Sequence, residues 1–376
     1  MKHVAVVFGT RPEVVKLGPV IQELRRAPDL FRVTVVATGQ HREMLRQALT
    51  FFDIVPDVGL DIMRPDQDLF TLTARALSEL RGLFDGTRPD LVMVQGDTTT
   101  AFAAALAGYY ARIAVAHVEA GLRSGDLGNP YPEEGNRRMI SSLAGWHFAP
   151  TTVAEAHLLG EGVPADRVFV TGNTIIDALA HVLERRGSLL PETVEGLELA
   201  ALSPRVLLVT CHRRESFGED LRRIFSGLRR IVEKNPDVAI VYPVHPNPNV
   251  EGAARGLLQG VPRIHLLPPV DYEAFVALMR RAYLILTDSG GVQEEAPFLN
   301  KPVLVLRTVT ERPEGVAAGV ARIVGTDTDQ IVAETQRLLD DAAAHAEMAR
   351  SVNPYGDGRA AARIVGVLRD RFMGAA

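Results

Sequence analysis

The segment from residue 117 to residue 138 holds the densest set of side chains that could do chemistry. It reads HVEAGLRSGDLGNPYPEEGNRR and contains four carboxylates and three guanidiniums among Gly and Pro, without a helical or alternating apolar period. A long loop with so little to bury more often binds or catalyses than merely connects. Glu119, Glu133, Arg123 and Arg137 are therefore candidates for acid-base chemistry and anion binding. Each alone fits a solvated salt bridge equally well, but four together favour function.

Two motifs of the first half place charge directly after an apolar strand. GTRPEVVK follows the first apolar run, and its Gly-rich turn into a helix would bind an anion, with Arg11 and Lys16 supplying charge. Thr10 and Glu13 have capping-box spacing there, so an ordinary strand-turn-helix fits as well. Asp97, in VQGDTTT, follows another strand. Capping the next helix is its simplest role, and acting as an acid or base is the alternative.

The second half repeats this arrangement in VTCHRRESFGED. His212 comes just after a strand and is followed by two arginines, which suits a phosphate or a proton transfer, although exposed histidines are common. Ser216 and Glu219 have the spacing of a capping box for the next helix. Cys211, the only cysteine, is expected to be a small buried hydrophobe.

The clearest nucleotide signal is LTDSGGVQEEAP. Ser289, Gly290 and Gly291 present a hydroxyl and unhindered amides at a predicted helix N-terminus, where a diphosphate would bind. Glu295 lies ~9 Å further along that helix, within reach of ribose hydroxyls. Arg312, in TERPE, could complete the phosphate site. A plain loop also fits Ser-Gly-Gly, and the Glu-Glu that follows makes the nucleotide interpretation stronger.

Short β-branched runs, each followed by a helical pattern, must position these motifs. The runs span residues 3 to 8, 33 to 38, 91 to 95, 113 to 118, 206 to 210, 238 to 243, 284 to 287 and 303 to 306. Continuous apolar strands that alternate with helices predict parallel sheets covered on both faces, with ligands at the carboxyl ends of the strands.

The fold class is therefore α/β with two Rossmann-like halves. Residues 185–204 carry Gly, Pro and charge without periodicity and are interpreted as a linker. This predicts an N-terminal domain over 1–184 and a C-terminal domain over 185–356. Residues 357–373 have a helical pattern.

Composition limits the partners of the chain. Its 376 residues carry a formal net charge of −5 and a pI near 6.1, so no global field attracts nucleic acid or an anionic membrane. One cysteine provides neither a disulfide framework nor a thiolate zinc cluster. No apolar stretch is long enough for a signal peptide or a membrane span. A cytoplasmic protein with no metal, nucleic-acid or membrane partner is expected.

Taken together, GTRPEVVKLGP, QGDTTT, HVEAGLRSGD with PEEGNRR, CHRRESFG, and DSGGVQEEAP with TERPE resemble the bacterial non-hydrolysing UDP-N-acetylglucosamine 2-epimerases. The match spans almost the whole chain in order. It implies two Rossmann-like domains of the glycosyltransferase-B type facing a cleft, and a C-terminal helix (357–376) that returns to the first domain. It also implies UDP-N-acetylglucosamine and UDP as ligands, no cofactor, and a homodimer. The positions that match functional residues of the family are Arg11, Lys16, Asp97, Glu119, Glu133, Arg137, His212, Ser289, Glu295 and Arg312.

The reaction that the resemblance implies explains this number of charges. The proton on sugar C2 has no adjacent carbonyl, so UDP must leave C1 before the proton or with it, giving a 2-acetamidoglucal. UDP then adds back, and protonation of C2 from the opposite face inverts it. Carboxyl groups are needed on both sides of C2. Asp97, Glu119 and Glu133 are expected to be this acid-base set, with their individual roles open. Arg11, His212 and Arg312 would stabilise the departing diphosphate.

Some family members bind a second substrate molecule as an activator, and Gln40, Arg213 and His245 resemble that site. Glu43 stands where a glutamine is expected, and Asp66 where an arginine is expected. Acid in place of positive charge disfavours activator phosphates, and so disfavours this kind of activation.

Three other functions fit parts of the sequence. A glycosyltransferase of the same fold would use Ser-Gly-Gly and Glu295 for its donor, but it does not need carboxylates on both faces of C2. A hydrolysing 2-epimerase would release free N-acetylmannosamine. A catalytically dead sensor of UDP-sugars would keep Ser289 and Glu295 and could lose the acid-base set, which is complete in this sequence.

Overall fold

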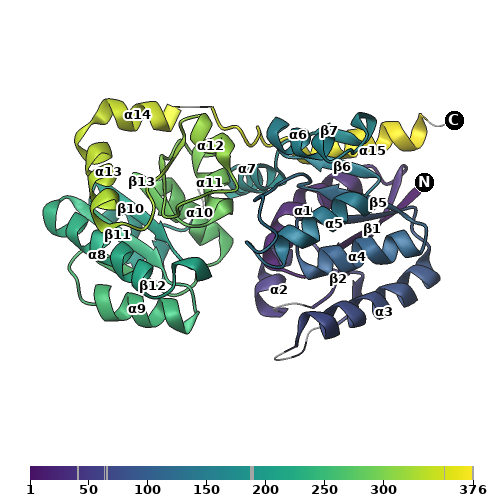
Figure 1. Cartoon of the computed structure of the whole chain (residues 1–376), viewed down its shortest axis with the longest axis horizontal. Coiled ribbons are helices and arrows are strands. Elements are labelled where there is room, and N and C mark those ends of the chain that lie inside the picture. Colours follow the sequence, from purple (N-terminus) through teal and green to yellow (C-terminus); the bar gives the residue numbers. More distant parts are fainter. Residues whose placement is uncertain (40–41, 63, 65–66, 187–189, 351, 375–376) are drawn as a thin grey trace. The chain divides into compact units, whose positions relative to one another are not determined.

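The computed structural model describes residues 1–39, 42–62, 64, 67–186, 190–350 and 352–374. The chain folds into two compact units (Figure 1). Unit 1 is Met1–His181 together with Tyr355–Ala376, and unit 2 is Val182–Pro354. The chain therefore leaves unit 1 after His181 and returns to it at Tyr355. These crossings were expected from the sequence at 184/185 and 356/357.

Unit 1 is built on a seven-stranded sheet in which every neighbouring pair is parallel. In spatial order its strands are β3 (Val58–Gly59), β2 (Phe31–Ala37), β1 (Lys2–Phe8), β4 (Leu91–Gln95), β5 (Ala114–Val118), β6 (Trp146–Ala149) and β7 (Val168–Val170). Its helices are α1 (Arg11–Arg25), α2 (Arg42–Phe51), α3 (Leu69–Thr87), α4 (Thr99–Tyr110), α5 (Glu133–Leu143), α6 (Thr152–Gly160), the 3-10 turn η1 (Ala165–Arg167), α7 (Thr174–Arg186), which continues into unit 2, and α15 (Ala360–Met373).

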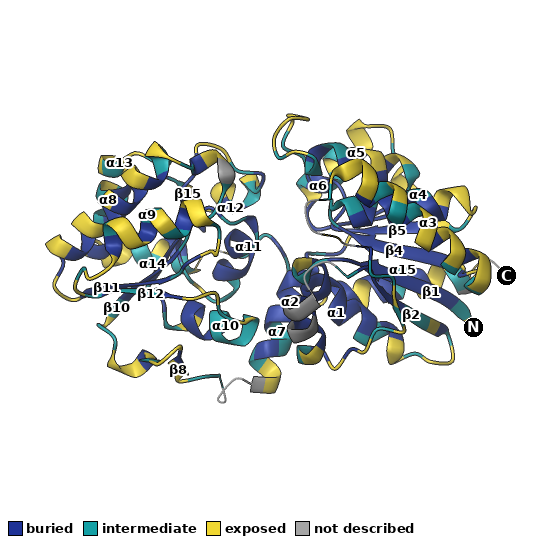
Figure 2. Ribbon diagram, turned by 90° about the horizontal axis from the view of Figure 1, so that it is seen from below, coloured by how far each residue is buried: buried dark blue, intermediate teal, exposed yellow. Residues whose placement is uncertain are grey.

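Helices cover both faces of this sheet. On one face α4 packs between α3 and α5, and on the other α1 packs against α2 and α15. Figure 2 shows the central strands between these layers as largely buried, with β4 buried along its whole length and β5 from its second residue. Small side chains let α4 approach the sheet, because a Cβ on Gly108 would lie 3.1 Å from Val115 Cγ2. Strand order reverses between β1 and β4, so ligands are expected at their carboxyl ends.

Unit 2 repeats the plan with a six-stranded, all-parallel sheet. Its strands in spatial order are β12 (Ile264–Leu267), β11 (Val238–Pro243), β10 (Arg205–Thr210), β13 (Leu284–Thr287), β14 (Val303–Val305) and β15 (Ala321–Ile323). Its helices are η3 (Arg214–Ser216), α8 (Glu219–Lys234), α9 (Pro248–Leu258), α10 (Tyr272–Arg281), α11 (Gly290–Phe298), α12 (Pro313–Ala317), α13 (Thr328–Asp340) and α14 (Ala342–Arg350). Here the order reverses between β10 and β13.

The predicted linker is wrong for the part of 185–204 that the structure describes. An antiparallel hairpin forms there from β8 (Thr193–Val194) and β9 (Leu197–Glu198), followed by the 3-10 turn η2 (Leu199–Ala201). Arg281 then fixes the segment to unit 2, because its guanidinium donates to four carbonyls between Leu199 and Pro204 at 2.7 to 3.3 Å. Such satisfied backbone groups are typical of an ordered part of a domain.

Candidate active site

Asp97 lies at the carboxyl end of β4 and forms an ion pair with Arg137 from α5. Asn136 Nδ2 also donates to the Asp97 carbonyl at 2.9 Å. The capping role considered for Asp97 is wrong, since Thr98 caps α4 by accepting from Ala101 N at 3.0 Å. The Asp97 carboxylate is therefore available to pair with Arg137, whose side chain is almost wholly buried. A buried partner of this kind indicates a site with fixed geometry.

Glu119 lies at the carboxyl end of β5, next to β4, and adopts a φ of 64°. This left-handed conformation is uncommon outside glycine and is concentrated at functional sites. Its buried carboxylate accepts from Lys16 of α1, from Gln95 at the end of β4, and from Asn173 Nδ2 at 3.2 Å. All three are donors, so the structure provides an environment suited to an ionised carboxylate.

Residues 133–138, predicted as loop, form the start of helix α5. The loop prediction missed it because the polar face of this helix dominates the local sequence. Glu133 begins the helix, and its Oε2 is buried without a hydrogen-bond partner in the described part of the chain. Glu134 is fully buried and accepts from Ser124 N at 3.0 Å and from Arg138 Nε at 2.9 Å, while Arg137 Nη1 lies 3.3 Å away.

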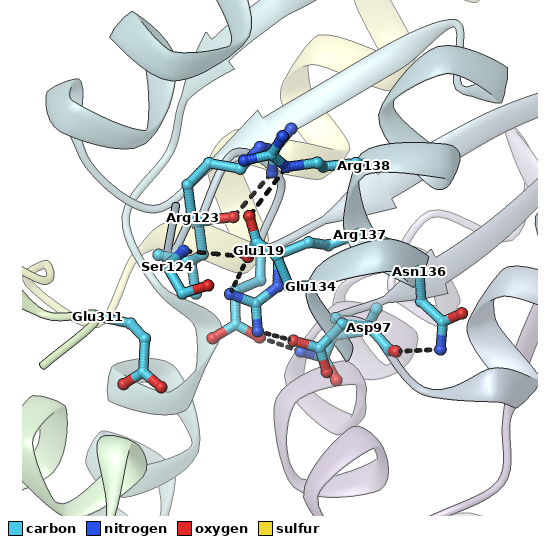
Figure 3. A network of polar contacts seen from close by, with 12 residues as sticks. Asp97, Glu119, Arg123, Ser124, Glu134, Asn136, Arg137, Arg138 and Glu311 are labelled. Atoms are coloured by element: carbon cyan, nitrogen blue, oxygen red, sulfur yellow. Dashed lines mark hydrogen bonds and ion pairs between the residues drawn. The ribbon is translucent and has the colours of Figure 1, made fainter. Parts of the chain in front are cut away.

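The network in Figure 3 therefore runs from Arg138 through Glu134 and Arg137 to Asp97. Glu134 orients the arginine that in turn holds Asp97. Glu134 was not among the residues selected from the sequence, although it stands three residues before Arg137, where helical side chains meet.

Arg123 lies at the margin of this network (Figure 3), and its ion pair is with Glu161 outside it. Its guanidinium makes two hydrogen bonds with Glu161, at 2.8 and 2.6 Å, and donates to Ser141 Oγ at 2.9 Å. The bonds from Arg123 lower the pKa of Glu161, against a smaller opposing effect of burial. Arg123 therefore has the salt-bridge role that the sequence analysis gave as the alternative, and it connects the loop to Glu161 at the end of α6.

The turn after β1 contributes a further buried acid, Glu13. Glu13 closes the predicted capping box by accepting from Thr10 N at 2.7 Å, and it also accepts from Gly9 N at 3.1 Å and Thr98 Oγ1 at 2.9 Å. Burial raises the pKa of Glu13, and these hydrogen bonds oppose the rise. Arg11 is half-buried at the first position of α1. Glu13 thus ties the β1 turn to the β4 turn that carries Asp97.

His117 stabilises the turn after β4 that carries Asp97. Its Nε2 lies 2.7 Å from the Gly96 carbonyl, and burial lowers the pKa of His117 to about 3. A neutral imidazole that donates to this carbonyl fixes the residue that precedes Asp97.

In unit 2, Ser289 is the N-cap of α11, the position that sequence predicted for a phosphate site. Gly290 beside it leaves room for Arg312, because a Cβ there would come within 2.9 Å of Arg312 Cζ. Arg312 Nε donates to Glu294 at 2.8 Å, and Glu294 is almost fully buried. Its guanidinium is thereby fixed against the helix N-terminus, where it adds positive charge to the first amides of the helix.

Glu295 follows on the same helix and is also buried. Tyr272, at the start of α10, donates its hydroxyl to Glu295 Oε1 at 2.6 Å. Sequence reasoning selected Glu295 but missed Tyr272, because nothing local signals a partner 23 residues away.

Asp288, immediately after β13, organises the His212 turn. It is fully buried, and its Oδ2 accepts from His212 N at 2.6 Å and Arg213 N at 2.7 Å. Its Oδ1 lies 3.3 Å from His212 Nδ1. Burial lowers the pKa of His212, while Asp288 acts in the opposite direction. The His212 ring stacks on His245, with ring centroids 5.3 Å apart. Asp288 could have been found as the polar residue that ends an apolar strand.

The capping box predicted from Ser216 is wrong, because Ser216 lies in η3 and Gly218 is the N-cap of α8. Cys211 is buried as predicted, and burial raises the pKa of its thiol. Gln40, the side chain of Glu43, and Asp66 lie outside the described residues.

Within the described ranges, no group of three or more His, Cys, Asp or Glu side chains could hold a metal ion. None of the helices described is both long enough and apolar enough to cross a membrane.

The two all-parallel Rossmann-like sheets define a protein of the glycosyltransferase-B fold. The UDP-N-acetylglucosamine 2-epimerase family model matches residues 22–369. The chain therefore belongs to the UDP-N-acetylglucosamine 2-epimerase family, whose members are isomerases.

Individual relatives match over nearly their full length. The UDP-N-acetylglucosamine 2-epimerase of Yersinia pestis is 50% identical over 98% of both chains. The crystal structure of the Neisseria meningitidis enzyme bound to UDP-GlcNAc is 44% identical with a TM-score of 0.91, covering 97% of this chain and 99% of that one. The Methanocaldococcus jannaschii enzyme, in complex with UDP-GlcNAc and UDP, is 34% identical with a TM-score of 0.84, covering 97% and 99%.

Proposed function

We propose that this protein interconverts UDP-N-acetylglucosamine and UDP-N-acetylmannosamine by reversible inversion at sugar C2. The observation that carries the proposal is the gathering of carboxylates around the ends of β4 and β5, where Asp97 and Glu119 each pair with a buried cation. Binding a nucleotide sugar, or transferring its sugar, does not require this acid-base set. Full-length relatives that hold UDP-GlcNAc or UDP support the same substrate.

The reaction begins with an anti elimination. One carboxylate takes the C2 proton as the C1–O bond breaks, UDP leaves with the electron pair, and a C1–C2 double bond forms. UDP oxygen then adds back to C1, and a carboxyl on the other face gives C2 a proton. Asp97, Glu119 and Glu133 form this set, with Lys16 and Arg137 fixing Glu119 and Asp97. General acid-base groups of this kind typically contribute ~10²–10⁴-fold to rate.

Unit 2 holds UDP throughout. Ser289, Gly290 and Gly291 present their amides to the diphosphate, and Arg312 adds charge at the same helix end. Glu295, oriented by Tyr272, accepts from ribose hydroxyls. His212 and Arg11 stabilise the negative charge that develops on the departing diphosphate. A held UDP can return to the glucal, which distinguishes epimerisation from net release.

Two further expectations follow from the family resemblance. The protein forms a homodimer, which light scattering would detect as twice the chain mass, and it works in the cytoplasm, where a single buried cysteine needs no oxidising environment.

Incubation of the purified protein with UDP-N-acetylglucosamine alone, followed by chromatography of the products, tests the proposal. UDP-N-acetylmannosamine in equilibrium with the substrate is the expected result. Free N-acetylmannosamine with UDP would instead establish the hydrolysing reaction. Unchanged substrate that still binds would contradict epimerisation and favour a transferase or a sensor.

A further inference from the structure

Asn173 occupies an unusual position between the acid-base set and the chain connections of unit 1. It is buried, follows β7, and directly precedes α7. Its side-chain Nδ2 donates to Glu119 Oε1 at 3.2 Å. β7 and α7 lie far from Glu119 in the sequence, so the contact exists only in the folded unit.

The orientation of the Asn173 amide is fixed by a second hydrogen bond. Its Oδ1 accepts from Ile175 N at 3.1 Å, as an N-cap side chain does at the start of a helix. With the oxygen committed to the helix, only the NH₂ group can face Glu119. The amide therefore offers Glu119 a donor and cannot accept from it.

The backbone of Asn173 is anchored to the returning chain. Its N–H donates to the Tyr355 carbonyl at 2.7 Å, at the residue where the chain re-enters unit 1. One helical turn further along α7, Asp177 accepts from Ala360 N and Ala361 N at 3.0 and 2.8 Å. Helix α7 itself contains the other crossing, after His181. Asn173 thus joins Glu119 to the helix and the segment through which the chain leaves and re-enters unit 1.

We propose that Asn173 is a positioning residue for the epimerase reaction, which holds the Glu119 carboxylate in its reactive orientation through Nδ2. This role rests on the proposed function, in which Glu119 exchanges the C2 proton. Lys16 from α1 and Gln95 from β4 also donate to the Glu119 carboxylate, and His117 lies two residues before it on β5. Asn173 adds to these contacts a donor whose own orientation is fixed by the start of α7.

Asn173→Ser isolates the contact, because a serine can still cap Ile175 N but is too short to donate to Glu119. A fall in kcat of about tenfold to a hundredfold is expected, similar to the loss of other orienting partners, with KM changed little. The affinity for UDP, which unit 2 holds, should stay unchanged. Wild-type kcat in Asn173→Ser would overturn the inference.

Asn173→Asp supplies a readout that a merely structural role would not give. At pH 8 two carboxylates face each other in this variant, and activity should fall at least as far as in Asn173→Ser. As the pH is lowered to 6 the pair takes up one proton, and the introduced carboxyl group, once protonated, can donate to Glu119 as the amide does. Relative to wild type at each pH, kcat should recover by about tenfold or more. A constant ratio to wild type across this range would contradict the inference.

Asn235→Asp is the matched control. Asn235 is similarly buried in unit 2, and its Nδ2 donates to Ile231 O and Gln336 Oε1. It should show no pH-dependent recovery of kcat.

A cooperative melt and wild-type UDP affinity establish that each variant is folded. If Asn173→Asp does not fold, the result for Asn173→Ser alone tests the inference. Wild-type protein without epimerase activity would contradict the proposed function, whereas active wild type with an equally active Asn173→Ser contradicts only this inference.

Discussion

The carboxyl ends of the central strands, β1, β4 and β5 in unit 1 and β10 and β13 in unit 2, are similar places in two similar sheets, yet they carry different polar groups. In unit 1 the polar groups are ionic side chains that hold one another, as in the pairs of Glu119 with Lys16 and Asp97 with Arg137. In unit 2 a helix N-terminus begins at Gly290, and a buried Asp288 shapes the neighbouring turn through backbone amides.

The difference indicates a division of labour. A diphosphate needs amides and fixed positive charge, which backbone geometry supplies with little side-chain chemistry. Proton exchange at carbon needs carboxylates whose position and charge are controlled, and each control requires a further polar partner. The same fold therefore carries a binding site in one unit and a reactive site in the other.

The largest effect is expected from Glu119→Gln. Removing the charge while keeping the shape should lower kcat by ~10²–10⁴-fold, because the amide cannot take a proton from C2. UDP affinity, measured by calorimetry, should change less than about threefold. Glu155→Gln, in the first turn of α6 and outside the acid-base set, is the control and should retain activity. Equal losses of kcat and of UDP affinity in Glu119→Gln would contradict the assignment of proton exchange to unit 1 and UDP binding to unit 2.

A smaller effect is expected from Asp288→Asn. The amide oxygen can still accept from His212 N and Arg213 N, but the negative charge near His212 Nδ1 is lost. Asp288 raises the pKa of His212 against the effect of burial, so its removal should lower that pKa further. Less imidazolium is then present at pH 8, and kcat should fall about tenfold there and less at pH 6. An unchanged pH profile would show that Asp288 acts only by accepting hydrogen bonds from the backbone amides of the turn.

Tyr272→Phe should affect binding alone. Loss of the 2.6 Å hydrogen bond leaves Glu295 less well oriented, which should weaken UDP binding about threefold to tenfold. The preference for UDP over 2′-deoxy-UDP should shrink as well, with kcat unchanged. Tyr283→Phe, which loses a 3.2 Å bond to Leu338 O in the same unit, is the matched control. A lower kcat with unchanged affinity in Tyr272→Phe would reverse the roles assigned to the two units.

The smallest effect on activity is expected from Glu161→Gln, which breaks the Arg123 pair outside the acid-base network. Activity should stay within about twofold of wild type. The pKa of Glu161 is lowered in the folded protein, so its contribution to stability is present at neutral pH and is lost as the pH falls below its ordinary value of 4.5. Since Glu161 is partly exposed, the difference at pH 7 should be about 1 kcal/mol or less. Chemical denaturation at pH 7 and pH 3.5 tests this. A large loss of activity would contradict this assignment and show that Arg123 contributes to the active site.

Sequence predicted the central strands of both sheets well, because they are continuous apolar runs buried on both faces. β4, β11 and β13 match their predicted bounds. Strands at or next to a sheet edge were missed for physical reasons. β7 and β15 are three residues long, and β6 reads WHFA, with a histidine whose neutral form is buried. Such strands are formed by pairing with the sheet rather than by local propensity.

The candidate residues were predictable where local sequence carries the signal, as in the position of Ser289 at a helix start. Their partners were not. Asn173 and Tyr272 act through contacts that the fold creates, and no local pattern marks them. Glu134 and Asp288 do carry a local signal, but their partners become visible only in the folded chain. The capping role considered for Asp97 is wrong because Thr98, one residue later, takes that position and frees the carboxylate for Arg137.

Proton NMR of UDP-N-acetylglucosamine with the purified protein in D₂O tests proton exchange at C2 directly, by following the C2 proton and the anomeric signals together. UDP-N-acetylmannosamine is expected to appear with deuterium at C2, while the remaining substrate also loses its C2 proton with time and no free sugar accumulates. An epimerised product that keeps its original C2 proton would contradict proton exchange by the carboxylates of unit 1.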